Sequence, residues 1–170
     1  MDVCPVIPLL LAIGLVAGCK TAPLPQPAES RPEARSETML FTQIDHPAIS
    51  CRDPQAQMDW YCRNLGMRVI ATNGQQPPSA ILGFGEGGVR GGSILEIMPV
   101  KDAGPSPAEM PRFAPGLRHL AFRVSDFEKA YAKLKSAGVT FLFEPTTAVG
   151  GGKIVSFRDP EGNELQIVQR

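Results

Sequence analysis

The sequence predicts an α+β domain of two tandem βαβββ modules, whose sheets face each other around a central cleft. Three observations support this prediction. One stretch of about 27 residues recurs in similar form later in the chain. Both copies contain a helix with recognisable start and stop residues, and three short apolar segments of strand character follow each helix.

The repeat is visible when two segments are aligned. "IDHPAISCRDPQAQMDWYCRNLGMRVI" (44–70) matches "LRHLAFRVSDFEKAYAKLKSAGVTFLF" (117–143) in its pattern of apolar and polar residues. A histidine opens the apolar strand at the start of each copy, His46 in the first and His119 in the second. The two halves should therefore place these imidazoles at equivalent positions.

Both predicted helices carry capping residues. Asp53 and Asp126 each lie seven residues after the histidine, where a carboxylate can accept from the first free N–H groups of a helix. Gly66 and Gly138 follow the helical stripes and suit a left-handed C-terminal cap. We place Trp60 and Tyr61 in helix packing rather than in a site.

Three strands are expected after each helix. They cover 67–72, 80–85 and 92–98 in the first half, and 139–145, 153–159 and 164–169 in the second. The last strands align as "ILEIM" with "ELQIV", so that Glu96 and Gln166 are equivalent. The glycine-rich "GEGGVRGG" is interpreted as a hairpin loop, since no helix and no Gly-Lys-Ser/Thr sequence follows it.

The alternation of residues in the first strand predicts where the site lies. Ile49 and Cys51 belong under the helix, which leaves His46, Ala48 and Ser50 on the open face of the sheet. Two imidazoles, a carboxylate and an amide oxygen would then project into the cleft, and such groups can bind a divalent metal. These candidate ligands are His46, Glu96, His119 and Gln166.

Length and composition limit the number of domains and the classes of partner. The 170 residues fit one domain over 42–170, with module one at 42–100, a linker at 101–115 and module two at 116–170. The net charge is zero and no basic run occurs, which argues against a nucleic-acid partner. Cys51 and Cys62 should lie too far apart along strand and helix to favour a disulfide. A disulfide between them is the less favoured alternative.

The N-terminal segment differs from the rest. "VCPVIPLLLAIGLVAGC" is typical of the apolar region of a secretory signal, and "LVAGC" resembles the lipobox of bacterial lipoproteins. This resemblance implies a signal peptide at 1–18, a lipid on Cys19 and a proline-rich tether at 19–41. Lys20, in place of aspartate, implies an outer-membrane location facing the periplasm. "MDVCP" lacks the usual basic residue, and an uncleaved buried segment is the alternative.

Five segments of the domain carry a resemblance to a known family. "IDHPAI", "DWYCRNLGMRV", "ILEI", "LRHLAFRVSD" and "FRDPEGNELQIV" occur in the order found in the vicinal oxygen chelate superfamily. That superfamily contains glyoxalase I, methylmalonyl-CoA epimerase, extradiol dioxygenases and the bleomycin or fosfomycin resistance proteins. The resemblance covers 43–170 and implies a glyoxalase-like fold. It specifies the fold better than the reaction, because this fold hosts many chemistries.

By the same resemblance, the four metal positions fall on His46, Glu96, His119 and Gln166. Glyoxalase I of the bacterial type has glutamate at the last position. An amide there leaves a divalent site with net charge about +1, which should weaken metal binding. Gln166 cannot act as a base, so proton abstraction would fall to Glu96. Glu164, on the same strand face, is an alternative fourth ligand.

Three functions follow as hypotheses. The first is a lyase or isomerase that resembles glyoxalase I, uses Zn, Ni, Mn or Fe and acts on a small carbonyl compound. The second is an extradiol-type dioxygenase, although that family places its carboxylate where Gln166 stands. The third is a metal-free module that binds a small molecule. Arg112 and Arg118 could meet an anionic substrate or only solvent, and the resemblance allows pairing as a homodimer.

Overall fold

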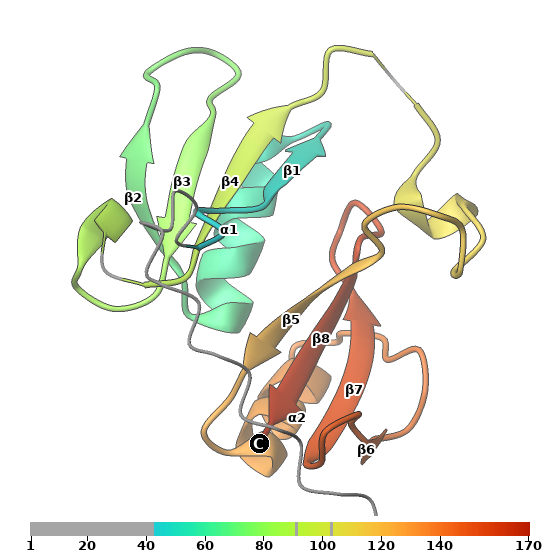
Figure 1. Cartoon of the computed structure of the whole chain (residues 1–170). Coiled ribbons are helices and arrows are strands. Elements are labelled where there is room, and N and C mark those ends of the chain that lie inside the picture. Colours follow the sequence, from blue (N-terminus) through green and yellow to red (C-terminus); the bar gives the residue numbers. More distant parts are fainter. Residues whose placement is uncertain (1–42, 91, 103) are drawn as a thin grey trace, which may run out of the picture. The chain divides into compact units, whose positions relative to one another are not determined.

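The computed structural model describes residues 43–90, 92–102 and 104–170. Its elements repeat the order strand, helix, strand, strand, strand (Figure 1). The first module contains β1 Ala48–Cys51, α1 Pro54–Leu65, β2 Arg68–Thr72, β3 Ala80–Gly83 and β4 Ile94–Pro99. The second contains β5 His119–Arg123, α2 Phe127–Ser136, β6 Thr146–Thr147, β7 Lys153–Arg158 and β8 Glu164–Gln169. Short 3-10 turns occupy Gly88–Arg90 and Pro107–Glu109.

Each module forms its own four-stranded mixed sheet. The strand order is β1-β4-β3-β2 in the first and β5-β8-β7-β6 in the second. The first strand of each module runs parallel to the last, and the other pairs are antiparallel. In Figure 1 each helix lies behind the sheet of its own module. The α+β class and the two-module organisation predicted from the sequence are confirmed.

The capping residues act as their positions predict. The Asp53 carboxylate accepts from the N–H of Ala56 at 2.9 Å, and Asp126 accepts from the N–H of Lys129 at 3.0 Å. Gly66 closes α1 in the left-handed region with φ of 75°, where a residue with a side chain would be strained. The helix boundaries are thus set by local chemistry.

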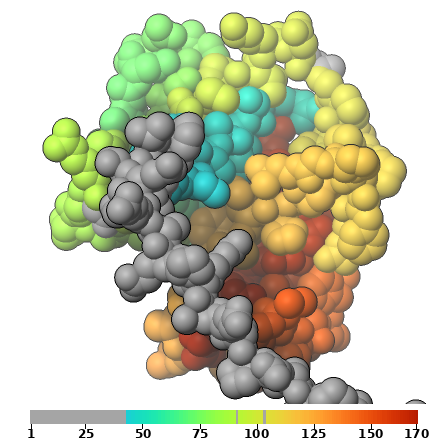
Figure 2. All heavy atoms as spheres, in the orientation of Figure 1, coloured from blue at the N-terminus to red at the C-terminus, as the bar shows by residue number. Residues whose placement is uncertain are grey.

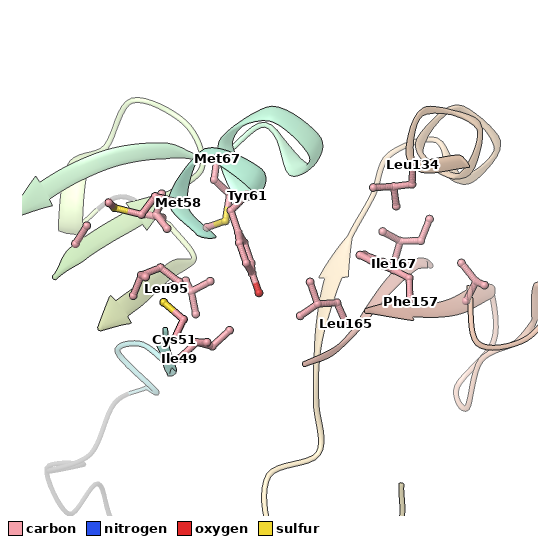
Figure 3. Packing of buried hydrophobic residues seen from close by; sticks show 14 of the residues in the cluster. Ile49, Cys51, Met58, Tyr61, Met67, Leu95, Leu134, Phe157, Leu165 and Ile167 are labelled. Atoms are coloured by element: carbon pink, nitrogen blue, oxygen red, sulfur yellow. The ribbon is translucent and has the colours of Figure 1, made fainter. Parts of the chain in front are cut away.

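The sheets present one apolar and one more polar face. In β1, Ile49 and Cys51 are buried while Ala48 and Ser50 are exposed. Figure 3 shows the resulting core, with Met58, Met67 and Leu95 in one group and Leu165, Ile167 and Phe157 in another. The buried residues of both modules belong to one contiguous cluster, so the two modules share a core.

One predicted strand is largely replaced by irregular chain. Of 139–145, Phe141 forms an isolated bridge to Phe157 and the Leu142 N–H donates to the Ser156 carbonyl at 2.8 Å, while the regular strand β6 begins after Pro145. Proline has no N–H to donate to a sheet ladder, so the pairing is interrupted there. The apolar pattern that suggested a strand instead places Phe141 against Tyr131, with ring centroids 4.5 Å apart.

A buried carboxylate joins the modules. Asp159 lies in the β7–β8 turn, is 5% exposed, and accepts five hydrogen bonds. Two come from α1, from Gln57 Nε2 at 2.6 Å and from the Tyr61 hydroxyl at 2.9 Å. The others come from the backbone of Glu161 and from the backbone and side chain of Asn163. In Figure 3 the Tyr61 oxygen lies between the two groups of core residues.

The linker is fixed to the same turn. The Ser106 hydroxyl donates to the Glu161 carbonyl at 2.7 Å, and Arg52 donates both to Glu161 and to the carbonyl of Gly104. Gly162 makes this approach feasible, because a Cβ there would lie 2.5 Å from Ser106 Oγ. The linker is therefore held at this turn, and Figure 2 shows the linker in yellow.

The remaining sequence predictions concern the N-terminal segment and the cysteines. The signal peptide, Cys19 and the tether at 19–41 lie outside the described residues. Within 43–90, 92–102 and 104–170, no helix has both the length and the apolar character needed to cross a bilayer. Cys51 and Cys62 are free thiols, as favoured.

Replacing Asp159 should weaken the contact between the modules and so lower the stability of the domain. Asp159→Asn removes an acceptor shared by buried donors, and we expect the free energy of unfolding to fall by about 3 kcal/mol. Urea denaturation measures this change. Asp59→Ala, at an exposed carboxylate of α1, is the matched control and should cost less than about 0.5 kcal/mol. Equal losses in the two variants would contradict a special role of Asp159.

Candidate functional site

The open face of module one brings two predicted ligands together. His46 Nε2 lies 3.3 Å from Glu96 Oε2, although 50 residues separate them in the chain. The parallel pairing of β1 with β4 explains this contact, because Ala48 is the register partner of Glu96. His46 and Glu96 are both about one-third exposed, with side-chain exposures of 31% and 29%. A ligand can therefore reach both groups.

A neighbouring carboxylate orients the imidazole. Asp45 Oδ2 lies 2.6 Å from His46 Nδ1, which makes Nδ1–H the donor and leaves Nε2 directed at Glu96. The hydrogen bond with Asp45 is the main cause that raises the pKa of His46, and the bond with Glu96 adds to it. This carboxylate–histidine arrangement is the one that often supports a metal-bound imidazole.

The spacing of the pair fits a shared ion. Two ligand atoms at about 2.1 Å from a metal, at an angle of about 100°, lie about 3.2 Å apart. The observed separation of Nε2 and Oε2 is 3.3 Å. A cavity of about 410 Å³ lies nearby and is lined by Asp45 and Pro47, the chain neighbours of His46, although neither His46 nor Glu96 lines it. Module one thus provides two donors at a suitable spacing, both partly exposed.

Module two places its candidates at equivalent register positions. Ala121 pairs with Gln166 just as Ala48 pairs with Glu96, so the equivalence inferred from the repeat holds in the structure. Gln166 is 8% exposed and its Nε2 donates to Ser156 Oγ at 3.0 Å. Since the amide nitrogen is committed, Oε1 is the atom that could meet an ion. His119 lies beside Glu164 in the β5–β8 pairing and is exposed.

Glu164, which the sequence offered as an alternative fourth metal ligand, pairs with an arginine instead. Arg112 from the linker binds it through two parallel hydrogen bonds, Nε to Oε2 at 2.9 Å and Nη2 to Oε1 at 2.7 Å. Burial opposes the charged carboxylate, but hydrogen bonds from Arg112 and Ser156 outweigh it and lower the pKa of Glu164. Arg112 also lies over the ring of Phe143, 5.0 Å from its centroid. Both Glu164 and Arg112 are therefore engaged with each other.

The predicted ligand His119 does not join His46 and Glu96 in one cluster. Within the described ranges, no group of three or more His, Cys, Asp or Glu side chains could hold a metal ion. His119 instead borders a cavity of about 210 Å³ together with Glu164 and with Ala48 and Ser50 of β1. The open faces of the two modules therefore meet at β1 and β5, with one pair of candidate donors on each.

Two functional features were missed by sequence reasoning. Asp45 precedes His46 directly, so an acidic residue beside a candidate ligand histidine was an available signal. The Arg112–Glu164 pair joins the linker to the last strand, and no local pattern announces such a contact.

Comparison with known proteins establishes the family. The profile of the "Glyoxalase/Bleomycin resistance protein/Dioxygenase superfamily" matches residues 43–167, and the chain belongs to this superfamily. YwkD of Bacillus subtilis (strain 168) is 29% identical over 133 residues, covering 78% of this chain and 100% of YwkD. YaeR of Escherichia coli (strain K12) is also 29% identical over 133 residues, covering 75% and 96%. Both are uncharacterised proteins, so they supply no reaction.

Solved structures agree on the fold. SMU.1112c has a TM-score of 0.61 at 29% identity, covering 75% of this chain and 98% of that one. A glyoxalase family protein from Enterococcus faecalis has a TM-score of 0.57 at 26% identity, covering 76% and 99%. Residues 43–170 form one compact unit, and the match spans nearly the whole length of both of these proteins.

The Arg112–Glu164 pair should stabilise module two. Arg112→Met leaves a carboxylate that is 7% exposed without its cation, and we expect a loss of about 2 kcal/mol in unfolding free energy. The estimate is below that for a fully buried pair because Arg112 is 38% exposed. Urea denaturation of residues 40–170 measures the loss.

Two further variants test this explanation. Glu164→Gln in the Arg112→Met background should recover part of the loss, because a neutral amide is less costly to bury than a lone carboxylate. Lys101→Met, at an exposed linker position, should have little effect. An Arg112→Met protein as stable as the Lys101→Met protein would refute the importance of the pair.

Proposed function

We propose that this domain binds a divalent metal ion and acts as a lyase or isomerase on a small carbonyl compound. The observation that carries the proposal is the 3.3 Å separation of His46 Nε2 and Glu96 Oε2, with Asp45 fixing the imidazole. Superfamily membership supports it, because the same fold occurs in an E144Q variant of glyoxalase I from Zea mays, at a TM-score of 0.58.

The chain's own residues would divide the chemistry. A divalent ion bound by His46 and Glu96 would supply polarisation of a substrate carbonyl. Glu96 is the carboxylate next to that position, so it would take and return the proton. Gln166 would contribute only a neutral oxygen, since an amide cannot accept a proton at neutral pH. Asp45 would hold His46 in the tautomer that presents Nε2.

A homodimer would complete the donor set. One chain holds His46 and Glu96 on module one and His119 and Gln166 on module two, and the described part of the chain does not unite the pairs. We propose that a second copy brings a module two pair against the module one pair of the first. Association in solution and metal retention should then occur together.

Metal content tests the proposal directly. Wild-type residues 40–170, dialysed against Zn, Ni or Mn, should retain close to stoichiometric metal by mass spectrometry. Glu96→Gln should weaken retention by about tenfold or more, because a charged ligand is lost. Gln166→Glu should strengthen retention, since it neutralises the net charge of the site. Glu86→Gln, at an exposed carboxylate that pairs with Arg68, is the control and should behave as wild type.

Other results of the metal measurement would contradict this proposal or favour a different function. Metal bound equally by wild type and Glu96→Gln would exclude the proposed ligand pair. No metal in wild type but uptake by Gln166→Glu would favour a metal-free binding module, the second candidate function. That candidate is supported by the separation of the two donor pairs within the described residues. An extradiol-type dioxygenase fits less well, because the carboxylate nearest His119 is engaged by Arg112.

We propose further that Cys19 anchors the domain in the cell envelope, at the outer membrane facing the periplasm. The sequence "LVAGC" and the absence of aspartate after the cysteine support this location. Cys19→Ser should move the full chain from the membrane fraction to the soluble fraction in a bacterial host, since the acyl chains would be lost. Cys4→Ser is the matched control, and membrane retention of the Cys19→Ser protein would contradict the anchor.

A further inference from the structure

A cavity between the modules is lined by residues other than the candidate metal ligands. It has a volume of about 290 Å³ and is lined by module one at Met67, Phe84 and Ile94, and by β5 at Leu120 and Phe122. Its walls are mainly apolar, and the volume is near the lower end for small-molecule pockets. None of His46, Glu96, His119 and Gln166 lines it.

A second, smaller cavity adjoins the first. It measures about 130 Å³ and shares Phe84, Phe122 and Arg123 with the larger one. The rings of Phe84 and Phe122 meet edge to face with centroids 6.1 Å apart, so they form an aromatic wall common to both. Lys133 of α2 lies at the smaller cavity, which places two cations around a mostly apolar space.

The charges along these walls have one sign. Arg123 lines both cavities, and no aspartate or glutamate lines either of them. Among the described residues, no carboxylate forms an ion pair with Arg123. A guanidinium beside apolar walls favours a ligand that brings a carboxylate or sulfonate, because its planar donors match such groups.

We propose that this inter-module cavity binds a small apolar anion, whose hydrocarbon or aryl part packs on Phe84 and Phe122 and whose carboxylate binds Arg123. The Ser93 hydroxyl at the larger cavity offers an additional donor. Burial of the apolar part provides the affinity, and the Arg123 contact selects charged over neutral ligands. The site does not require the proposed metal, since it uses different side chains.

Isothermal titration with a matched pair of ligands tests the proposal. Octanoate should bind residues 40–170 about tenfold more tightly than 1-octanol, because only the acid can use the charge-assisted contact. Arg123→Met should reduce octanoate affinity to that of 1-octanol, while Arg123→Lys should retain part of the preference. Arg63→Met, an exposed arginine of α1 that lines neither cavity, should leave both affinities unchanged.

A cavity-filling variant and a metal chelator complete the test. Ala121 lines the larger cavity on the exposed side of β5, so Ala121→Leu should weaken octanoate and 1-octanol together without loss of stability. Octanoate binding should persist in EDTA and in Glu96→Gln. Its failure alone would leave metal binding untouched, so the two proposals fail separately.

Two outcomes would overturn the inference. Equal affinity of wild type and Arg123→Met for octanoate would show that Arg123 does not bind the carboxylate of the ligand. Absence of octanoate binding, with dimer formation lost in Ala121→Leu, would assign the cavity to contact with a second copy of the chain.

Discussion

The arrangement of the domain depends on one shared buried carboxylate. Asp159 belongs to module two, yet two of its five hydrogen bonds come from Gln57 and Tyr61 on the helix of module one. A buried carboxylate needs several donors, and here three come from module two and two from module one. Burial and the charge of Asp159 raise the pKa of Tyr61, so the phenol stays protonated and keeps donating. This network is a polar contact between the two modules, beside the apolar core that they share.

Parallel pairing explains why the candidate ligands occur as two pairs. In each module the first and last strands run side by side, so residues about 50 positions apart in the chain become neighbours on the open face. The same rule yields different chemistry in each half. His46 and Glu96 meet at metal-ligand spacing, whereas Gln166 turns its amide nitrogen to Ser156 and Glu164 binds Arg112. Duplication of the fold has therefore not kept the site symmetric.

Much of the fold was predictable because its signals are local. Caps at Asp53 and Asp126, the left-handed Gly66 and the alternation in β1 each act within a few residues. The segment 139–145 was misread as a strand, since Phe141 and Phe143 are apolar for packing on Phe157 and Arg112 instead. The Arg112–Glu164 pair and the Asp159 network join distant segments. A single sequence records no signal for such contacts.

The close approach of Gly162 to Ser106 brings the linker into direct contact with the β7–β8 turn. Because no side chain intervenes, the β7–β8 turn holds the linker by a direct contact rather than through flexible atoms. The same linker, a few residues later, holds Glu164 through Arg112. The linker thus contacts both the β7–β8 turn and the face of module two that carries His119. A substitution that lengthens the side chain at 162 would therefore disturb the linker as well as the turn, because a Cβ there would lie 2.5 Å from Ser106 Oγ.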